Sequence, residues 1–353
     1  MRRDPPSVVV ALSGGVDSSV TAALLIEAGW KVEGLHFIFP VSISKQGHNI
    51  RSVQRVAETL QIPLCQLDLQ EEFTRKVIEP FTEAYLKGMT PNPCVSCNEL
   101  IKFDHLLRFA NENGIDSIAT GHYAVVKKED HSPGELWRGK DRRKEQSYFL
   151  HRLKQSHLSR LLLPLGRMRK EETFDLAERM GLPTAYESES QEICFISGDD
   201  YRPFIERRKG PIIDTKGDIM DGDGSKLGEH DGTYRFTIGQ RHGLGIASPR
   251  PYYVMEILPE KNQVIVGRKE DLYSNVVEAE SFNWLSGAPP QGKERAMAQV
   301  RYKHTAAQGC LDVLSSDKVM FRFDEPQWAA TPGQALVCYQ GARLLGGGWI
   351  VRF

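Results

Sequence analysis

Two cysteines three residues apart are the side chains of this sequence best suited to chemistry. Cys94 and Cys97 form a Cys-x-x-Cys pattern just before a stretch with helical character. The N-terminus of a helix is the positive end of its dipole, which stabilises a thiolate and lowers the pKa of a nearby thiol. Thiols in such a position are nucleophiles or metal ligands. Because no second Cys-x-x-Cys follows, a zinc site of four thiolates has too few ligands.

Of the other four cysteines, one is a candidate for the same site. Cys194 lies in the segment 190–195, far from the pair in sequence, and folding could bring it close. The remaining three lie in apolar, strand-like contexts, where a buried and unreactive thiol is the usual state; they are Cys65, Cys310 and Cys338. Six cysteines in 353 residues are too few for a disulfide scaffold, which favours catalytic or metal-binding thiols.

A second chemical feature is the loop Ser-Gly-Gly-Val-Asp-Ser-Ser at residues 13–19, between a β-rich run and a helix. Its glycines permit tight turns, its hydroxyls add donors, and the amides of the following helix face an anion. It lacks the lysine of a Walker loop, which disfavours a kinase-like or GTPase-like site. The loop resembles that of the PP-loop ATP pyrophosphatases, which cleave ATP between the α and β phosphates and transfer AMP to an oxygen. The resemblance implies that Asp17 holds magnesium or orients the pyrophosphate. A glycine-rich turn without a ligand is the alternative.

The elements that must position these residues change character along the chain. In the first half, β-rich runs alternate with helical patterns, which predicts βαβ units and a parallel sheet. The strands are expected at 8–12, 32–39 and 116–120, and the helices at 20–28, 53–60, 71–86, 98–113 and 170–180. From about residue 210 onward, short strands separated by turns predict one or two β domains. They include a hairpin of 252–258 with 263–267 and strands at 319–323, 335–339 and 343–345.

Composition and charge limit the functional classes. Hydrophobic residues make up 40% and charged residues 26%, the balance of a soluble globular protein. The apolar run 8–12 is too short for a signal peptide and no stretch could span a membrane, so we expect a cytoplasmic protein. A net charge of −1 argues mildly against a nucleic-acid partner. Between residues 138 and 170, however, eleven Lys or Arg residues face only two acidic ones, a stretch that could follow a phosphate backbone or form a solvated basic face.

The whole sequence closely resembles the bacterial tRNA-specific 2-thiouridylases, the MnmA family. The resemblance is carried by motifs at 13–18, 88–93, 97–103, 119–124, 146–150, 190–195, 237–241 and 331–334. It implies an α/β fold class with three domains. These are a PP-loop ATP-binding domain with a parallel sheet (1–200), a central β-rich domain that contacts tRNA (201–272) and a C-terminal β-barrel (273–353).

The resemblance also implies the chemistry. ATP adenylates O2 of the uridine at the tRNA wobble position (U34), which makes a leaving group, and sulfur then displaces AMP. Cys194 carries the sulfur as a persulfide, received from a sulfur-relay protein or a cysteine desulfurase. Cys97 is the nucleophile that attacks the persulfide or closes a disulfide with Cys194 after transfer. The implied substrates are tRNAs for Lys, Glu and Gln.

Binding residues follow from the same resemblance, motif by motif. The ATP contacts are Ala11, Leu12, Ser13, Gly14, Gly15, Val16, Asp17, Ser18, Leu35 and Gly121. The tRNA contacts are Asn92, Pro93 and Cys94 at the target base, and His122, Lys144, Glu145, Gln146, Arg301, Tyr302 and Gln334 elsewhere. The target base must leave its stack to reach such a pocket. For His122 a merely packed histidine is the alternative.

One position departs from the usual pattern of the family. Many relatives carry Asp where this chain has Cys94, so a carboxylate that could assist proton transfer is replaced by a thiol. Three thiolates, from Cys94, Cys97 and Cys194, could instead hold a [4Fe-4S] cluster with one iron open to sulfide. The sequence leaves the persulfide and the cluster open as sulfur carriers.

Two other functional classes fit part of the sequence. Another AMP-forming PP-loop synthetase, acting on a small molecule, would share the ATP loop but would have no use for the paired cysteines. An RNA-binding module with a vestigial loop is the third class, and the intact Ser13, Asp17 and Ser18 argue against it.

Overall fold

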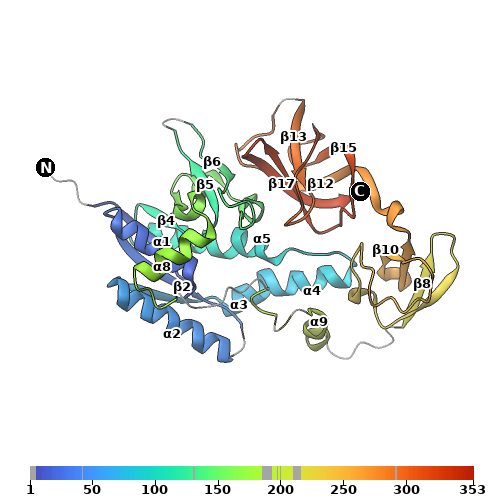
Figure 1. Ribbon diagram of the computed structural model, residues 1–353, viewed down its shortest axis with the longest axis horizontal. Coiled ribbons are helices and arrows are strands. Elements are labelled where there is room, and N and C mark those ends of the chain that lie inside the picture. The colour runs from blue at the N-terminus through green and yellow to red at the C-terminus, as the bar shows by residue number, and fades with distance from the viewer. Residues whose placement is uncertain are drawn as a thin grey trace.

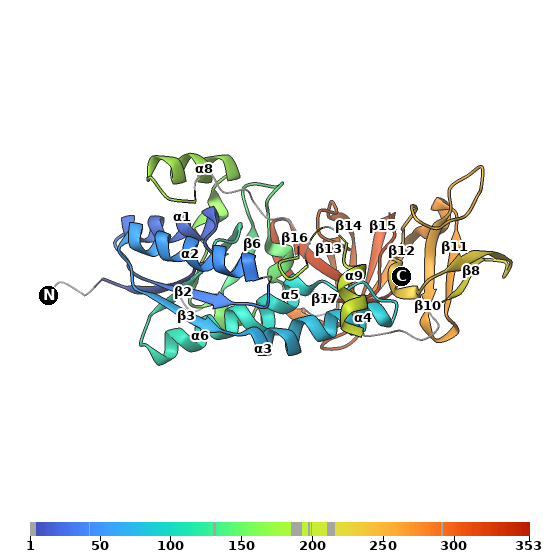
Figure 2. The same cartoon turned by 90° about the horizontal axis from the view of Figure 1, so that it is seen from below.

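The computed structural model describes residues 5–41, 43–129, 132–184, 193–196, 198, 200–209, 216–290 and 292–353. The molecule is elongated, with a parallel sheet at one end, a small β sheet at the other and a β-barrel between them (Figures 1 and 2). This is the α/β architecture with appended β domains that the sequence predicts.

The first part is a five-stranded parallel sheet in the order β3-β2-β1-β4-β7. The strands are β1 (Ser7–Ala11), β2 (Lys31–Ile38), β3 (Leu64–Asp68), β4 (Ser117–Ala119) and β7 (Leu161–Leu162). Side chains alternate between the two faces of a strand. In β1, Val8 and Val10 therefore pack into one hydrophobic cluster with helix residues such as Leu25, whereas Val9 packs into another with Leu106. Both faces of the sheet are covered, as expected for a parallel sheet.

Helices lie on both faces of this sheet (Figure 2). On one face are α1 (Val16–Glu27) and α2 (Ile43–Leu60), with α8 (Lys170–Arg179) beyond α1. On the other face, two long helices each contain a π-helical segment. They are α3 (Gln70–Phe73), η1 (Thr74–Ile78) and α4 (Glu79–Leu86), and then α5 (Pro93–Cys97), η2 (Asn98–Lys102) and α6 (Phe103–Glu112). Shorter helices are α7 (Gln155–Leu158), α9 (Arg202–Lys209), η3 (Ser147–Leu150), η4 (Pro164–Arg167), η5 (Thr233–Arg235), η6 (Pro259–Lys261) and η7 (Lys269–Leu272).

The sheet order creates a switch point between β1 and β4. The chain leaves β1 toward β2 on one side and returns to β4 on the other, so the loops after β1 and β4 diverge around a crevice at the carboxyl edge. Open α/β sheets bind ligands at such a crevice.

The second part is a four-stranded sheet in the order β10-β11-β8-β9. Its strands are β8 (Gly217–Asp221), β9 (Lys226–His230), β10 (Tyr253–Leu258) and β11 (Gln263–Gly267). The predicted hairpin is confirmed, because β10 and β11 pair antiparallel across residues 259–262. Ile219, Val254 and Val264 help to form a hydrophobic core that belongs to this sheet.

The third part is a closed antiparallel barrel of six strands. They are β12 (Tyr273–Trp284), β13 (Lys293–Gln299), β14 (Ala307–Val313), β15 (Val319–Trp328), β16 (Ala335–Gln340) and β17 (Arg343–Arg352), and β12 pairs with β17 to close the barrel. A hairpin from the first half of the chain, β5 (Ala124–Lys127) and β6 (Glu135–Arg138), joins β17 where Arg343 pairs with Trp137. The barrel is thereby bound to the α/β part. Among the described residues, no helix combines the length and the apolar character that crossing a membrane requires.

Candidate active site

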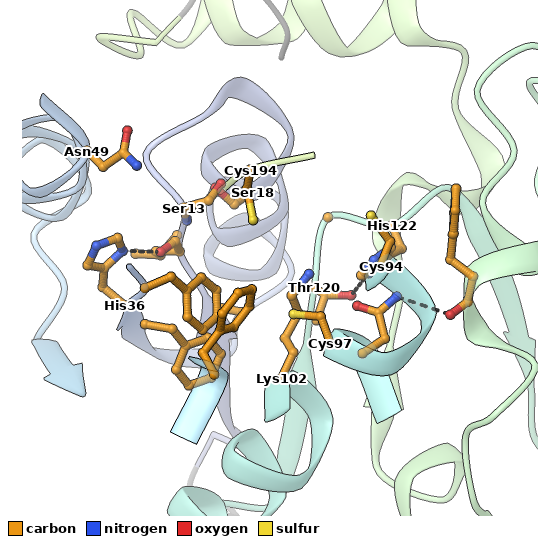
Figure 3. A pocket seen from close by; sticks show the side chains of 18 of the residues that line it. Ser13, Ser18, His36, Asn49, Cys94, Cys97, Lys102, Thr120, His122 and Cys194 are labelled. Carbon is orange, nitrogen blue, oxygen red and sulfur yellow. Dashed lines mark hydrogen bonds between the residues drawn. The ribbon is translucent and has the colours of Figure 1, made fainter. Parts of the chain in front are cut away.

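A cavity of about 440 Å³ lies at the switch point and brings together most of the residues that the sequence singles out (Figure 3). The loop after β1, strand β2, the helix that begins at α5, the loop after β4 and the segment around Cys194 all contribute to it. Its walls include Leu12, Ser13, Asp17, Ser18, His36, Phe39, Asn49, Cys94, Cys97, Lys102, Gly121, His122, Gln146 and Cys194. The three candidate thiols and the glycine-rich loop at residues 13–19 therefore face one space.

The phosphate loop has the conformation that its sequence predicts. Gly14 adopts φ +83°, and a Cβ at this position would lie 3.0 Å from Cβ of Ser52. The Ser18 hydroxyl donates to the carbonyl of Gly15 at 3.0 Å and lies 3.2 Å from the Ser13 hydroxyl. No side chain caps α1 at Gly15, so the amides of its first turn stay available to an anion.

Gly121 fixes the distance between the two loops of the crevice. A Cβ on Gly121 would lie 2.9 Å from the carbonyl carbon of Asp17 and 3.0 Å from the amide nitrogen of Ser18. Both contacts are with backbone, which cannot rotate away as a side chain can. The loop after β4 therefore reaches the start of α1 only because residue 121 is glycine.

Asp17 is engaged in a way that the sequence does not predict. Its two carboxylate oxygens accept hydrogen bonds from Nζ of Lys170 at 2.7 and 2.8 Å, and Oδ1 also accepts one from the Tyr123 hydroxyl at 2.7 Å. The Lys170 side chain is only 7% exposed. The loop has no lysine of its own, yet α8 places an ammonium beside it.

On the side of the cavity formed by β2, sequence reasoning named Leu35 alone. His36, Phe37, Ile38 and Phe39 line it, whereas the side chain of Leu35 is buried in the core. Leu35 contributes its carbonyl, which accepts a hydrogen bond from the Leu12 amide at 2.9 Å. The alternation of side chains along a strand could have indicated His36, the neighbour of Leu35, as a residue on the opposite face.

The Cys-x-x-Cys pattern lies inside a helix rather than before it. Helix α5 begins at Pro93, five residues earlier than predicted, so Cys94 lies in the first turn and Cys97 at the start of the second. Cys94 opens to the cavity, and Cys97 is buried in its wall. Burial raises the pKa of the Cys97 thiol to about 12 and also raises the pKa of Cys94, because the cavity walls surround even the accessible thiol. The prediction that the helix dipole lowers these pKa values is therefore wrong, since desolvation is the larger effect.

Cys194 faces the same cavity from another element. It is exposed, and the neighbouring Phe195 anchors its segment by edge contacts with Phe73 and Phe81 at 5.8 and 5.3 Å between ring centroids. Residues 190–192 of the same motif lie outside the described residues. All six cysteines are thiols in this structure. Of the three expected to be buried, Cys338 is, whereas Cys65 and Cys310 are only partly covered.

His122 lines the cavity near Cys94 and is not a histidine of the core (Figure 3). A hydrogen bond of 2.8 Å joins its Nδ1 to the hydroxyl of Thr120, and its ring stacks on Phe103 with the centroids 5.8 Å apart. Burial lowers the pKa of His122 well below its ordinary value, and the positive charge of Lys102 lowers it further. At neutral pH the imidazole is uncharged.

Among the residues expected to contact tRNA, one group lines the cavity and another is held by contacts within the fold. Gln146 lines the cavity and accepts a hydrogen bond from the Tyr123 amide at 3.0 Å. Glu145 is buried and accepts one from the Ser147 amide at 2.5 Å, which makes it a structural residue here. The basic stretch 138–170 is likewise not a uniform solvated face, because Lys140, Arg152 and Lys170 form ion pairs within the fold.

The barrel fixes the loop that leads into the Cys-x-x-Cys helix. Nε2 of the Gln334 side chain donates to the carbonyl of Thr90 at 2.8 Å, and the backbone amide of Thr90 donates to the carbonyl of Pro332 at 2.9 Å. On the loop between β13 and β14, Tyr302 packs against Phe149 at 4.3 Å between ring centroids, and Phe149 lines the cavity. The barrel therefore helps to shape the cavity as well as adjoining it.

The Gln334→Ala variant tests this connection. We expect faster amide hydrogen exchange at residues 88–92, by roughly a factor of five, because a lost hydrogen bond is worth about 1 kcal/mol. Mass spectrometry of the peptides provides the measurement. Gln340→Ala, at the exposed far end of β16, the strand that follows Gln334, is the matched control. Unchanged exchange in residues 88–92 would show that the barrel does not hold this loop.

No metal site is formed in the part of the chain that the structure describes. There, no three His, Cys, Asp or Glu side chains lie close enough together to hold a metal ion. The three cavity thiols are suited by type to a [4Fe-4S] cluster, but their placement does not form one.

Comparison with known proteins identifies relatives over the whole length. Three family models match: the tRNA methyl transferase HUP domain over residues 6–198, the tRNA methyl transferase PRC-barrel domain over 203–268 and the aminomethyltransferase beta-barrel domain over 274–350. The chain is 47% identical to a tRNA-specific 2-thiouridylase MnmA of Syntrophotalea carbinolica, covering 99% of this chain and 100% of that protein. It is 47% identical to the same-named protein of Carboxydothermus hydrogenoformans, covering 97% of both chains. With that of Geobacter metallireducens the identity is 44%, over 97% of this chain and 96% of the other.

Proposed function

This chain belongs to the tRNA-specific 2-thiouridylase family, and from that premise we propose how its cavity replaces the C2 oxygen of a tRNA uridine with sulfur. The enzyme is an ATP-dependent tRNA sulfurtransferase. The observation that carries the proposed route is that three thiols and the phosphate loop open onto one cavity. A methyl transfer, which the names of the family models suggest, would leave both the thiols and the loop without a role. A small-molecule synthetase would use the loop but would leave the thiols without a role.

The first step activates the uridine. The substrate is Mg·ATP, whose β and γ phosphates lie against the open amides of α1, with Ser13 and Ser18 as further donors. The uridine O2 attacks the α phosphorus, the bond to the β phosphate breaks, and pyrophosphate leaves. The C2 carbon then bears AMP as its leaving group. Because Lys170 and Tyr123 already occupy the Asp17 carboxylate, we assign Mg²⁺ to the phosphates and give Asp17 the role of holding Lys170.

The second step transfers sulfur. Cys194 is exposed, which suits loading with a persulfide by a sulfur-relay protein or a cysteine desulfurase. The terminal sulfur attacks C2, AMP leaves, and the base stays joined to Cys194 through a disulfide bond. The Cys97 thiolate then attacks the Cys194 sulfur, which releases 2-thiouridine and leaves a Cys97–Cys194 disulfide. In the alternative order, Cys97 first attacks the persulfide of Cys194 and releases sulfide. The sulfide then adds to C2 and displaces AMP, and the same disulfide remains. A dithiol reductant restores both thiols.

The substrate base enters the cavity beside Asn92, Pro93 and Cys94. It must leave the anticodon stack to do so. We propose U34 of the tRNAs for Lys, Glu and Gln as the target, with the PP-loop domain 1–200, the central domain 201–272 and the barrel 273–353 together holding the tRNA. Lys144, Gln146, Arg301 and Tyr302 are the proposed contacts. We place this reaction in the cytoplasm.

Cys94, which stands where the family usually has Asp, supplies a third thiol and so makes an iron-sulfur cluster a second candidate for the sulfur carrier. A [4Fe-4S] cluster would need Cys94, Cys97 and Cys194 to converge, which they do not do among the described residues, and we route no step through it. A cluster would be indicated if anaerobically purified protein contained iron and showed broad visible absorption, and if replacing any one of the three cysteines removed both. The three thiols would then have to converge. Active protein without iron supports the persulfide route.

The proposed function is tested in a strain that lacks the corresponding gene. We expect wild-type protein, but not an empty vector, to restore 2-thiouridine nucleosides in digested tRNA, and purified isoacceptors to carry the modification at position 34. With purified protein, tRNA should be required for pyrophosphate release. Release that depends on an amino acid instead of RNA would identify a small-molecule synthetase and reject the proposal.

A further inference from the structure

Lys102 is a charged residue of the cavity to which the route above gives no role. It is half-buried and lines the cavity together with Cys94 and Cys97. Figure 3 shows it beside Cys97 and Thr120, reaching into the same space. Within the described part of the chain, no carboxylate lies within ion-pair distance of its ammonium. A cation in a partly enclosed cavity without a partner is available to an anionic ligand.

The local backbone explains why Lys102 faces the thiols. In an α-helix, each residue turns by about 100°, so a residue five positions after Cys97 would point about 140° away from it. Residues 98–102 form a π-helical segment instead, in which the Phe103 amide donates to the carbonyl of Asn98, five residues back. This wider turn places residues i and i+5 on one face of the helix, so Lys102 follows Cys97 along the cavity wall. Such π segments occur frequently at functional sites.

No other charged group around the cavity, among the described residues, is free to pair with an anion beside the thiols. His122 is uncharged, since burial and the positive charge of Lys102 both lower its pKa. Lys170 is held by Asp17 at the phosphate loop. The positive charge of Lys102 also opposes the effect of burial on the pKa of Cys94 and Cys97. Sulfur in this reaction attacks as an anion, and an anion in a poorly solvated space requires a counter-charge.

We propose that Lys102 is the counter-ion of the attacking sulfur, holding the persulfide of Cys194 and then the Cys97 thiolate in place by an ion pair. This inference rests on the proposed function. The ammonium stays protonated throughout, and it neither forms nor breaks a covalent bond. Its contribution belongs to sulfur transfer and not to adenylation, for which the α1 amides and the loop hydroxyls hold the phosphates.

A charge-selective alkylation experiment tests the ion pair without tRNA or ATP. Iodoacetate is an anion and iodoacetamide is neutral, and both react with the same thiolate, so the ratio of their rates reports the charge beside the sulfur. We expect Lys102→Met to lower this ratio about fivefold at Cys194, which is exposed and is one of the two sulfurs of the proposed ion pair, and Lys102→Arg to keep it. Lys87→Met removes an exposed lysine just after the end of α4 and is the matched control. An unchanged ratio in Lys102→Met would overturn the proposal.

A single-turnover experiment separates the steps of the reaction. With tRNA and ATP, Lys102→Met should release pyrophosphate at nearly the wild-type rate but form 2-thiouridine roughly 50-fold more slowly, and Lys102→Arg should recover most of that loss. Equal losses in both steps would assign Lys102 to ATP or tRNA binding and reject its role at sulfur. If the wild type itself released no pyrophosphate with tRNA, the proposed function would fail while the alkylation result would still decide the ion pair.

Discussion

The Cys97→Ser variant is expected to stall with the tRNA base joined to Cys194 through a disulfide bond, and to form 2-thiouridine more slowly than the wild type by a factor on the order of 1,000. The thiol lies in the cavity wall beside Cys94, and a serine hydroxyl there would keep the shape of the site. A hydroxyl is almost never ionised near neutral pH and is a poor nucleophile toward sulfur, so the chemistry is lost without loss of the fold. Pyrophosphate should still be released in the first turnover, because the phosphate loop is unchanged.

Radioactive sulfur distinguishes Cys97 from Cys194 in this scheme. After incubation with a labelled persulfide donor, Cys97→Ser should retain the label on Cys194, whereas Cys194→Ser should never acquire it. Cys310→Ser, in a strand of the barrel, is the control and should behave as the wild type. Thiolation at the normal rate by Cys97→Ser would remove Cys97 from the mechanism and leave Cys194 as the only essential thiol.

The parts of the site that the sequence predicts correctly are those made by neighbours in the chain. The phosphate loop needs only the order of its glycines and hydroxyls between a strand and a helix, because those residues form it by themselves. The parallel sheet and the hairpin of β10 with β11 follow likewise from local periodicity.

Contacts between distant segments are what the sequence could not provide. Lys170 reaches Asp17 across 153 positions, and the hairpin of β5 and β6 joins a barrel strand from the other end of the chain. The thiol pKa is a related case. A helix N-terminus can be recognised from the sequence, but the desolvation that outweighs it at Cys97 depends on the walls of the cavity. The π-helical segment at 98–102 also has no periodic signature of its own.

The Asp17→Ala variant is expected to lower the free energy of unfolding by about 3 kcal/mol, the low end for breaking a buried ion pair, because the Asp17 side chain is partly exposed. Lys170 would keep its charge beside the rings of Tyr123 and Phe174 but lose its carboxylate. Urea denaturation measures the change. Lys140→Ala breaks the exposed pair with Glu172 at the same helix and should have little effect.

The same ion pair should also matter for ATP, and a double variant separates the two roles. In Lys170→Met, the Asp17 carboxylate loses the ammonium that neutralises it. ATP affinity should then fall on the order of 100-fold, because the carboxylate repels the phosphates and the cation beside them is gone. Replacing both residues, as Asp17→Asn with Lys170→Met, removes both charges, and apolar or neutral replacements of buried pairs often restore stability. We therefore expect the double variant to unfold nearly as the wild type while its ATP affinity recovers only in part. Full recovery of both quantities would mean that Lys170 serves the fold alone, and that the α1 amides suffice to hold the phosphates.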